Sequence, residues 1–309
     1  MPATVALTGA TGFIGATVAR QLAAAGWRVR ALVRPASLAR RPPGLEAEWI
    51  AGDLADTDSL RRLTRGATAV VHCAGAVRGA VRADFDRVNV DGTARLVQAA
   101  AAEPAPPRFL LVSSLAARAP ELSFYAASKR GGEAQLAALA GAMDWGVVRP
   151  AAVYGPGDRE MLPLFQAMFR GLAPVIGAAT NRVSLVHAED LAAALLAWLE
   201  RGRAHALYEV GDGRANGYSW QEIIDIAEGL RGRRILRLPV PVPLVRLVAR
   251  LNLALARLTG RAPMLSPGKV RELTHPDWVA DTTPLRGDTG WTPRIELAEG
   301  LRRTLNLVA

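Results

Sequence analysis

Cysteine is scarce in this chain of 309 residues, and no uncharged apolar run reaches about 18 residues. Cys73 is the single cysteine, which excludes an intrachain disulfide and a metal cluster of several cysteines and fits a reducing cytoplasm. The lack of a long apolar run predicts no membrane span. The chain passes from Met1 directly into an apolar segment, so we expect no secretion signal and a cytoplasmic location.

Lysine is almost absent as well. Lys129 and Lys269 are the only lysines among 38 basic residues, and the net charge is +10. The arginines are scattered and are not interleaved with aromatic residues, which indicates a basic solvated surface rather than a nucleic-acid site. We expect a small-molecule substrate and no nucleic-acid partner, and a homodimer is compatible with the sequence.

The most informative stretch is residues 8–15, which read Thr-Gly-Ala-Thr-Gly-Phe-Ile-Gly between a short β-branched run and a helical pattern. A strand, a glycine-rich turn and a helix let the backbone approach a pyrophosphate and offer it unpaired N–H groups. The glycine spacing differs from the usual fingerprint, so a turn that only packs helix against strand is the alternative. The cofactor interpretation predicts contacts from Gly9, Thr11, Gly12, Phe13 and Ile14.

Strand and helix patterns alternate through the first half of the chain and predict an α/β fold, a Rossmann-type doubly wound parallel sheet. The candidate strands are residues 4–8, 28–33, 47–51, 69–73, 108–113 and 145–149, and the candidate helices are residues 13–25, 59–65, 85–102 and 125–140.

Beyond residue 150 the pattern loosens. We expect a helix over 162–170, a strand over 183–186, a helix over 188–199, a strand over 207–210, and then short helices between proline-rich turns. This predicts an NAD(P)-binding domain of residues 1–154, to which residues 183–210 return. Residues 155–182 and 211–309 would form a smaller substrate-binding lid domain.

Residues 242–258 are apolar, with Arg246, Arg250 and Arg257 at near-helical spacing. This pattern predicts a half-buried helix of the smaller domain. A helix lying on a membrane surface is the alternative.

The residues after the second and third strands bear on the cofactor. An acid about 20 positions past the glycine turn favours NAD, whereas an arginine accommodates the 2′-phosphate of NADP. Arg34 stands in that region without an acid, which favours NADP, with NAD as the alternative. Asp53, followed by Leu54, is placed to accept from the adenine amino group, and it can equally serve as a turn or helix-cap aspartate.

Small residues follow the fourth strand. We expect Cys73, Ala74 and Gly75 to let the backbone approach the cofactor. His72 has no second ligand near it in the sequence, so no metal site is expected.

Ser114 ends the fifth strand, and Tyr125 and Lys129 stand four residues apart at the start of a helix, on one face. A nearby ammonium is expected to lower the pKa of the tyrosine, which makes Tyr125 a usable acid or base. Ser114 can hydrogen-bond a substrate oxygen. The alternative is an exposed tyrosine and lysine without a catalytic role.

Together these residues resemble the extended branch of the short-chain dehydrogenase/reductase superfamily, the NAD-dependent epimerase/dehydratase-like family. The resemblance implies a catalytic set of Ser114, Tyr125 and Lys129, with Lys129 also holding the nicotinamide ribose. It also implies that Pro150 and Ala151 border the nicotinamide. The matching segments are residues 8–15, 53–54, 72–75, 89–93, 113–114, 125–129, 149–157 and 186–191.

Two departures from related enzymes narrow the activity. Sugar-nucleotide dehydratases of this branch resemble one another in having an acidic pair just after the catalytic hydroxyl. This chain has Leu115 and Ala116 at that position. Residues 181–187 lack the Arg-Asp-aromatic pattern that often precedes the histidine of sugar-nucleotide epimerases. The sequence therefore favours a reductase of a small, partly apolar substrate, similar to hydroxysteroid dehydrogenases and flavonoid reductases.

We predict an NADP-dependent oxidoreductase that moves hydride between nicotinamide and a carbonyl or hydroxyl carbon. One alternative is a nucleoside-diphosphate-sugar 4-epimerase with bound NAD. A second alternative is a non-catalytic NADP-binding scaffold or sensor.

Overall fold

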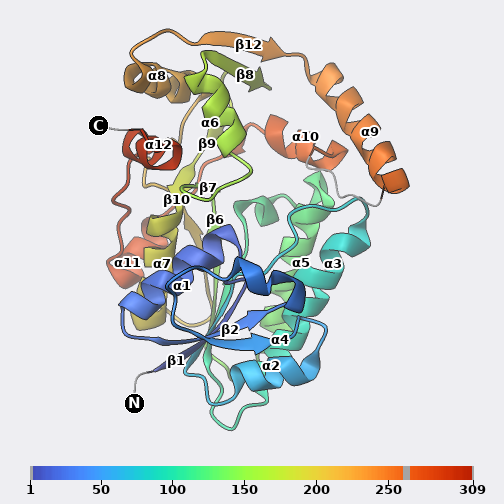
Figure 1. Ribbon diagram of the computed structural model, residues 1–309, viewed down its shortest axis with the longest axis vertical. Helices are drawn as coiled ribbons and strands as arrows, with labels where there is room; N and C mark the ends of the chain where they lie inside the picture. The colour runs from blue at the N-terminus through green and yellow to red at the C-terminus, as the bar shows by residue number, and fades with distance from the viewer. Residues whose placement is uncertain (1–2, 260–264, 308–309) are drawn as a thin grey trace.

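A parallel seven-stranded sheet forms the larger lobe of the computed structural model, which describes residues 3–259 and 265–307 (Figure 1). The strand order reverses between β1 and β4, so the carboxyl ends of these two strands border a crevice. The prediction of a Rossmann-type doubly wound sheet is confirmed. In spatial order the strands are β11 (Ala206–Val210), β6 (Trp145–Pro150), β5 (Arg108–Val112), β4 (Ala69–His72), β1 (Thr4–Thr8), β2 (Arg28–Val33) and β3 (Glu48–Ala51).

Helices cover both faces of this sheet. One face carries α1 (Phe13–Ala24), α7 (Ala188–Arg201) and α11 (Thr283–Thr289), whose apolar side chains share one buried cluster with the strands. The other face carries α2 (Thr57–Thr64), α4 (Asp91–Ala101) and α5 (Phe124–Leu139), which share a second buried cluster. Because the central strands β1, β4 and β5 are buried on both sides, most of their residues are apolar.

A second lobe lies beyond one end of the sheet (Figure 1). Its apolar core joins α6 (Leu162–Phe169), α8 (Trp220–Arg231) and α12 (Leu297–Leu305). At its outer end, β8 (Leu172–Ile176) pairs with β12 (Leu236–Val240), and α9 (Val242–Thr259) and α10 (Pro267–Thr274) follow. That the two lobes serve the cofactor and the substrate, with the domain boundaries given above, stays a proposal.

The single helix predicted over residues 85–102 is wrong. The chain forms α3 (Arg82–Asn89) and α4, which are separated at Val90. The Asn89 carbonyl accepts the Thr93 hydroxyl at 2.7 Å, and a Cβ on Gly132 of α5 would lie 2.4 Å from the Asn89 carbonyl oxygen. The break therefore coincides with a direct backbone contact to α5.

The strand predicted over residues 183–186 is divided. It forms β9 (Arg182–Val183), which pairs with β13 (Asp277–Trp278), and β10 (Leu185–His187), which pairs with β7 (Ala152–Tyr154). Ser184 lies between them, donating its N–H to the Trp278 carbonyl while its own carbonyl accepts from the Ala152 N–H. The chain thus changes its pairing partner from β13 to β7 at Ser184.

The strands β8 and β12 were not expected. Each contains a proline, Pro174 and Pro239, and a proline lowers the expectation of a strand because it cannot donate to the ladder. Both strands belong to a two-stranded sheet, where each has a free edge that tolerates the missing donor.

Candidate active site

The glycine-rich turn joins β1 to α1 with no room for side chains. Gly9 has a φ of +79°, and a Cβ there would lie 2.7 Å from the Ala74 backbone nitrogen. A Cβ on Gly15 would lie 2.2 Å from the Gly9 carbonyl oxygen. Close packing therefore accounts for Gly9 and Gly15, and the cofactor is not needed to explain either.

The start of α1 is suited to an anion. Gly12 is the N-cap residue, and in the described part of the chain no side chain caps this helix and no acid lies in its first turn. The N–H groups of Phe13 and Ile14 have no partner within the helix, and the helix dipole adds positive potential there. Together with Thr11, these groups fit the pyrophosphate of a dinucleotide.

Arg34 follows β2 and is exposed. Among residues 3–259 and 265–307, no hydrogen bond or ion pair engages its guanidinium. The neighbouring Ser37 is buried and accepts a hydrogen bond from Arg40 at 2.6 Å. The arrangement leaves Arg34 free for a phosphate, which fits the prediction of NADP.

Asp53 follows β3 and is exposed. Its Oδ1 accepts from the backbone N–H of Ala55 at 2.7 Å and of Asp56 at 3.2 Å, so it does act as a turn aspartate. The helix cap of α2 is Asp56 rather than Asp53. The other carboxylate oxygen of Asp53 is available for an adenine amino group, while Leu54 packs against Gly92 of α4.

The segment after β4 lies between the glycine turn and α5. Burial raises the pKa of the Cys73 thiol to about 12, so this thiol stays neutral. Ala74 contacts Gly9, and a Cβ on Gly75 would lie 3.7 Å from the Lys129 ammonium nitrogen. The structure thus brings the glycine turn, the segment 73–75 and Lys129 close together.

His72 is part of the core. Its Nδ1 lies 2.6 Å from the Thr8 hydroxyl and its Nε2 3.1 Å from the Thr93 hydroxyl. Burial, aided by the positive charge of Lys129, lowers the pKa of His72 to about 3, which keeps the ring neutral. Both ring nitrogens are occupied by hydroxyl groups.

Ser114 and Tyr125 meet at the end of β5. The Ser114 side chain lies beside the Tyr125 hydroxyl and acts to lower the pKa of the phenol. Burial nevertheless raises the pKa of Tyr125, and the charge of Glu272 adds to the rise while that of Lys269 opposes it. The expectation that Lys129 lowers the pKa of Tyr125 is therefore wrong for this structure.

The reason lies in where the Lys129 ammonium points. It donates to the Val112 carbonyl at 2.7 Å and is buried, with 8% of the residue exposed. Burial lowers the pKa of Lys129 to about 8, against the negative charge of Glu133 one turn further along α5. A buried amine with a lowered pKa is typical of functional sites.

Glu133 binds two neighbouring side chains at this end of the site. Its carboxylate forms a bidentate pair with Arg149, at 2.8 and 2.6 Å, and accepts the Ser113 hydroxyl. The side chains of Glu133 and Arg149 are each 7% exposed. Pro150 and Ala151 follow Arg149 at the end of β6, and the Ala151 N–H donates to the Val210 carbonyl.

The sequence reasoning missed one group, which α10 contributes. Glu272 accepts the hydroxyl of Ser123 just before α5, and Lys269 lies 3.0 Å from Glu272. Both charges act on Tyr125. One signal was visible: Lys269 is the second of two lysines in an arginine-rich chain.

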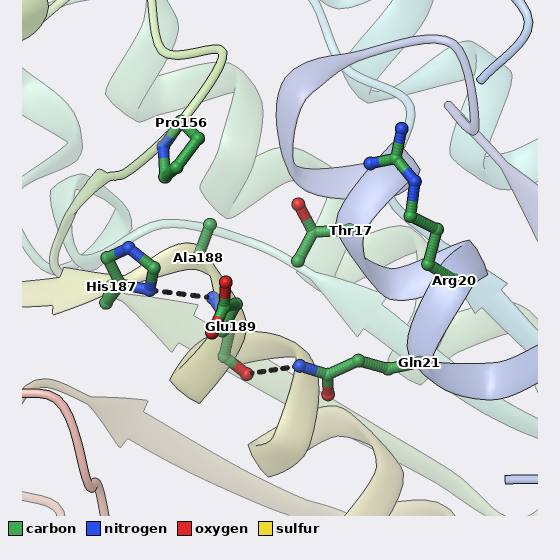
Figure 2. A pocket seen from close by; sticks show the side chains of 7 residues that line it. All are labelled: Thr17, Arg20, Gln21, Pro156, His187, Ala188 and Glu189. Carbon is green, nitrogen blue, oxygen red and sulfur yellow. Dashed lines mark hydrogen bonds between the residues drawn. The ribbon is translucent and has the colours of Figure 1, made fainter. Parts of the chain in front are cut away.

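A groove lined by other residues lies between α1 and the start of α7 (Figure 2). It holds about 260 Å³, and the Gln21 amide donates to the Glu189 carbonyl across it at 2.9 Å. Its lining includes Thr17, Arg20, Pro156 and His187, and none of the predicted site residues.

A family model now adds to this geometry. The model of the NAD-dependent epimerase/dehydratase family matches residues 5–211, from the first strand of the Rossmann sheet to the last. The chain belongs to this family. The predicted resemblance is confirmed, and the family indicates an NAD(P)-dependent enzyme, either a reductase or an epimerase.

Individual relatives differ in activity. A ceramide reductase from Caulobacter vibrioides is 41% identical over 303 residues, which cover 98% of this chain and 93% of the relative. A UDP-glucose 4-epimerase from Vibrio cholerae is 27% identical and covers 98% and 95%. A UDP-glucuronic acid 4-epimerase from Bacillus cereus, solved with UDP-glucuronic acid and NAD, shares the fold, with a TM-score of 0.73, 18% identity and 98% of both chains covered.

Proposed function

We propose that this family member is an NADPH-dependent reductase that converts a ketone on a ceramide-like, long-chain lipid to a hydroxyl group. The substrate class rests on one observation, the 41% identity to a ceramide reductase over nearly the whole of both chains. The apolar substrate favoured by the departures at Leu115 and Ala116 agrees with it. Both side chains are buried, so no charged group follows Ser114 at this point of the site.

Tyr125 is the proton donor in this proposal. Its raised pKa keeps the phenol protonated at neutral pH, which suits donation to the oxygen of a ketone undergoing reduction. Ser114, which contacts the same hydroxyl, holds that oxygen. When bound, a reduced nicotinamide group supplies the hydride to the carbonyl carbon. The hydride and the Tyr125 proton together convert C=O to CH–OH.

Other residues hold the cofactor. The first turn of α1 and the glycine turn take the pyrophosphate, and Arg34 takes the 2′-phosphate. Lys129, beside Gly75, takes the ribose hydroxyls. A buried lysine would be a poor choice for a non-catalytic scaffold, because desolvation of its ammonium opposes folding.

The epimerase alternative is supported by the relative from Vibrio cholerae at 27% identity. The structure provides an argument against it. Arg182 precedes His187 in the sequence, and its guanidinium is paired with Glu222 at 2.5 Å rather than free for a diphosphate. Glu222 also pairs with Arg214, so both guanidinium groups are held by one carboxylate.

The test uses purified protein, NADPH and an N-acylated long-chain ketone, with product identified by mass spectrometry. Tyr125→Phe should reduce kcat at least about 100-fold and leave NADPH affinity close to that of the native protein. Tyr154→Phe is the matched control, since in the described part of the chain its buried hydroxyl has no hydrogen-bond partner. Native turnover by Tyr125→Phe would contradict the assigned role.

A further inference from the structure

An exposed stripe of large apolar side chains runs along α9. Leu244, Leu247, Val248, Leu251 and Leu255 are between 40% and 62% exposed. Their spacing of three and four residues places them on one side of the helix. We call these five residues the α9 apolar face.

A different side of α9 packs on the protein. Val245 and Ala249 are buried in a small cluster with Val270 of α10. The helix therefore has one side that packs on the protein and a second apolar side that no described residue covers. An ordinary half-buried helix has a polar outer surface, so the α9 apolar face needs another partner.

The preceding strand also exposes large apolar side chains. In β12, Leu236 is 68% exposed and Leu238 is 46% exposed, and their two-residue spacing puts them on one side of the strand. Leu236 pairs in register with Leu172 of β8, which is 39% exposed. In Figure 1, β12 and α9 follow one another along the outer edge of the second lobe.

The charge on α9 is of one sign. The segment 242–259 contains arginine and no Asp or Glu. Arg246 and Arg250 are exposed, and no ion pair among residues 3–259 and 265–307 includes them. An apolar stripe flanked by arginines is typical of a helix that lies in the plane of a membrane and contacts anionic headgroups.

We propose that α9 and β12 form a surface that docks on an anionic lipid bilayer. No helix within residues 3–259 or 265–307 has the length and apolar character to cross a bilayer, so docking would be peripheral. A second copy of the chain fits less well, because a twofold contact through this surface would bring arginines together with no acid on α9 to pair with them.

The surface is linked to the candidate site through α10. Val270 of α10 packs under α9, while Glu272 accepts the Ser123 hydroxyl beside Tyr125. In Figure 1, α10 lies beside α9, on the side toward the middle of the second lobe. A lipid substrate would thus enter from the bilayer on the α10 side. This last step rests on the proposed function, whereas membrane docking does not.

Vesicle flotation tests the docking without any substrate. The full chain should float with phosphatidylglycerol vesicles, bind phosphatidylcholine vesicles more weakly, and lose affinity at high salt. Leu251→Ser combined with Leu255→Ser should weaken binding about tenfold or more. Leu207→Ser, at a residue 41% exposed on β11, is the matched control and should bind like the native protein.

A second pair of variants tests the contribution of charge to vesicle binding. Arg250→Glu should weaken binding to phosphatidylglycerol vesicles, while Arg65→Glu, at an exposed position on the Rossmann lobe, should not. All these positions are exposed, so unchanged thermal unfolding should accompany each variant.

Absence of flotation, or equal flotation of the Leu251/Leu255 variant, would overturn the proposal. So would a dimer in sedimentation that this variant dissolves without any vesicle binding, since the occupant would then be a second copy. Reduction of a short, water-soluble ketone without vesicles tests the proposed function separately, so failure of one is distinguishable from failure of the other.

Discussion

Replacing Lys129 by Met is expected to alter how the stability of the protein depends on pH. The lysine is buried, and its pKa is lowered from 10.5 to about 8. At ~1.4 kcal/mol for each pKa unit, the difference between 10.5 and about 8 amounts to about 3 kcal/mol of unfavourable burial at neutral pH.

The direction in which stability changes with pH follows from whether the folded or the unfolded chain keeps the Lys129 proton. Between pH 8 and 10.5 the unfolded chain keeps the Lys129 proton that the folded chain has lost. Folding stability from this group therefore rises with pH through that window. Between pH 7 and pH 10 the rise should be roughly 2–3 kcal/mol, and a methionine cannot provide it.

The variant also loses a donor to the Val112 carbonyl, at a cost of about 1–3 kcal/mol that does not depend on pH. Urea unfolding of the cofactor-free native protein and of Lys129→Met, at several pH values, separates the two effects. The difference between the two proteins cancels other titrating groups. A difference that stays constant from pH 7 to pH 10 would show that Lys129 is not a desolvated ammonium.

Two further substitutions test the cofactor and the support of the site. Arg34→Asp should weaken NADPH binding about ten- to a hundredfold and leave NADH binding similar or stronger, because a charged hydrogen bond to the 2′-phosphate is lost; calorimetric titration showing equal native affinities for the two cofactors would refute the NADP assignment. Glu133→Gln should destabilise the protein by about 3–5 kcal/mol, since Arg149 would keep a buried charge without its partner. Urea unfolding measures it, and Glu48→Gln, a surface partner of Arg28 and Arg30, should change stability much less.

The Rossmann sheet was predictable because its signals are local. Apolar strands, glycine ends and helical spacing all lie within short windows, and the glycine turn identified the first crossover. The break at Val90 was not predictable, since it coincides with a contact between Asn89 and Gly132, which are distant in sequence. The strands β8 and β12 were missed because their prolines are tolerated only in the two-stranded context that the tertiary fold creates.

In the candidate site too, local features were predicted from the sequence and long-range contacts were not. Residue types and spacing brought Ser114, Tyr125 and Lys129 together, but spacing alone did not give the direction of the Lys129 ammonium. That direction depends on the Val112 carbonyl, and the group acting on Tyr125 from α10 depends on how the second lobe packs. An interaction between charged groups on different lobes leaves no pattern in the sequence beyond an unusual residue type. Here that residue was Lys269.

The most direct measurement follows hydrogen from NADPH carrying deuterium at the transferred position of nicotinamide C4. The protein is incubated with an N-acylated long-chain ketone, and the lipid product and the cofactor are quantified together. We expect one NADP⁺ for each hydroxyl lipid formed, with deuterium on the carbon that bears the new hydroxyl. An unlabelled or absent lipid product, together with interconversion of uridine diphosphate sugars without added cofactor, would contradict the reductase account and establish the epimerase.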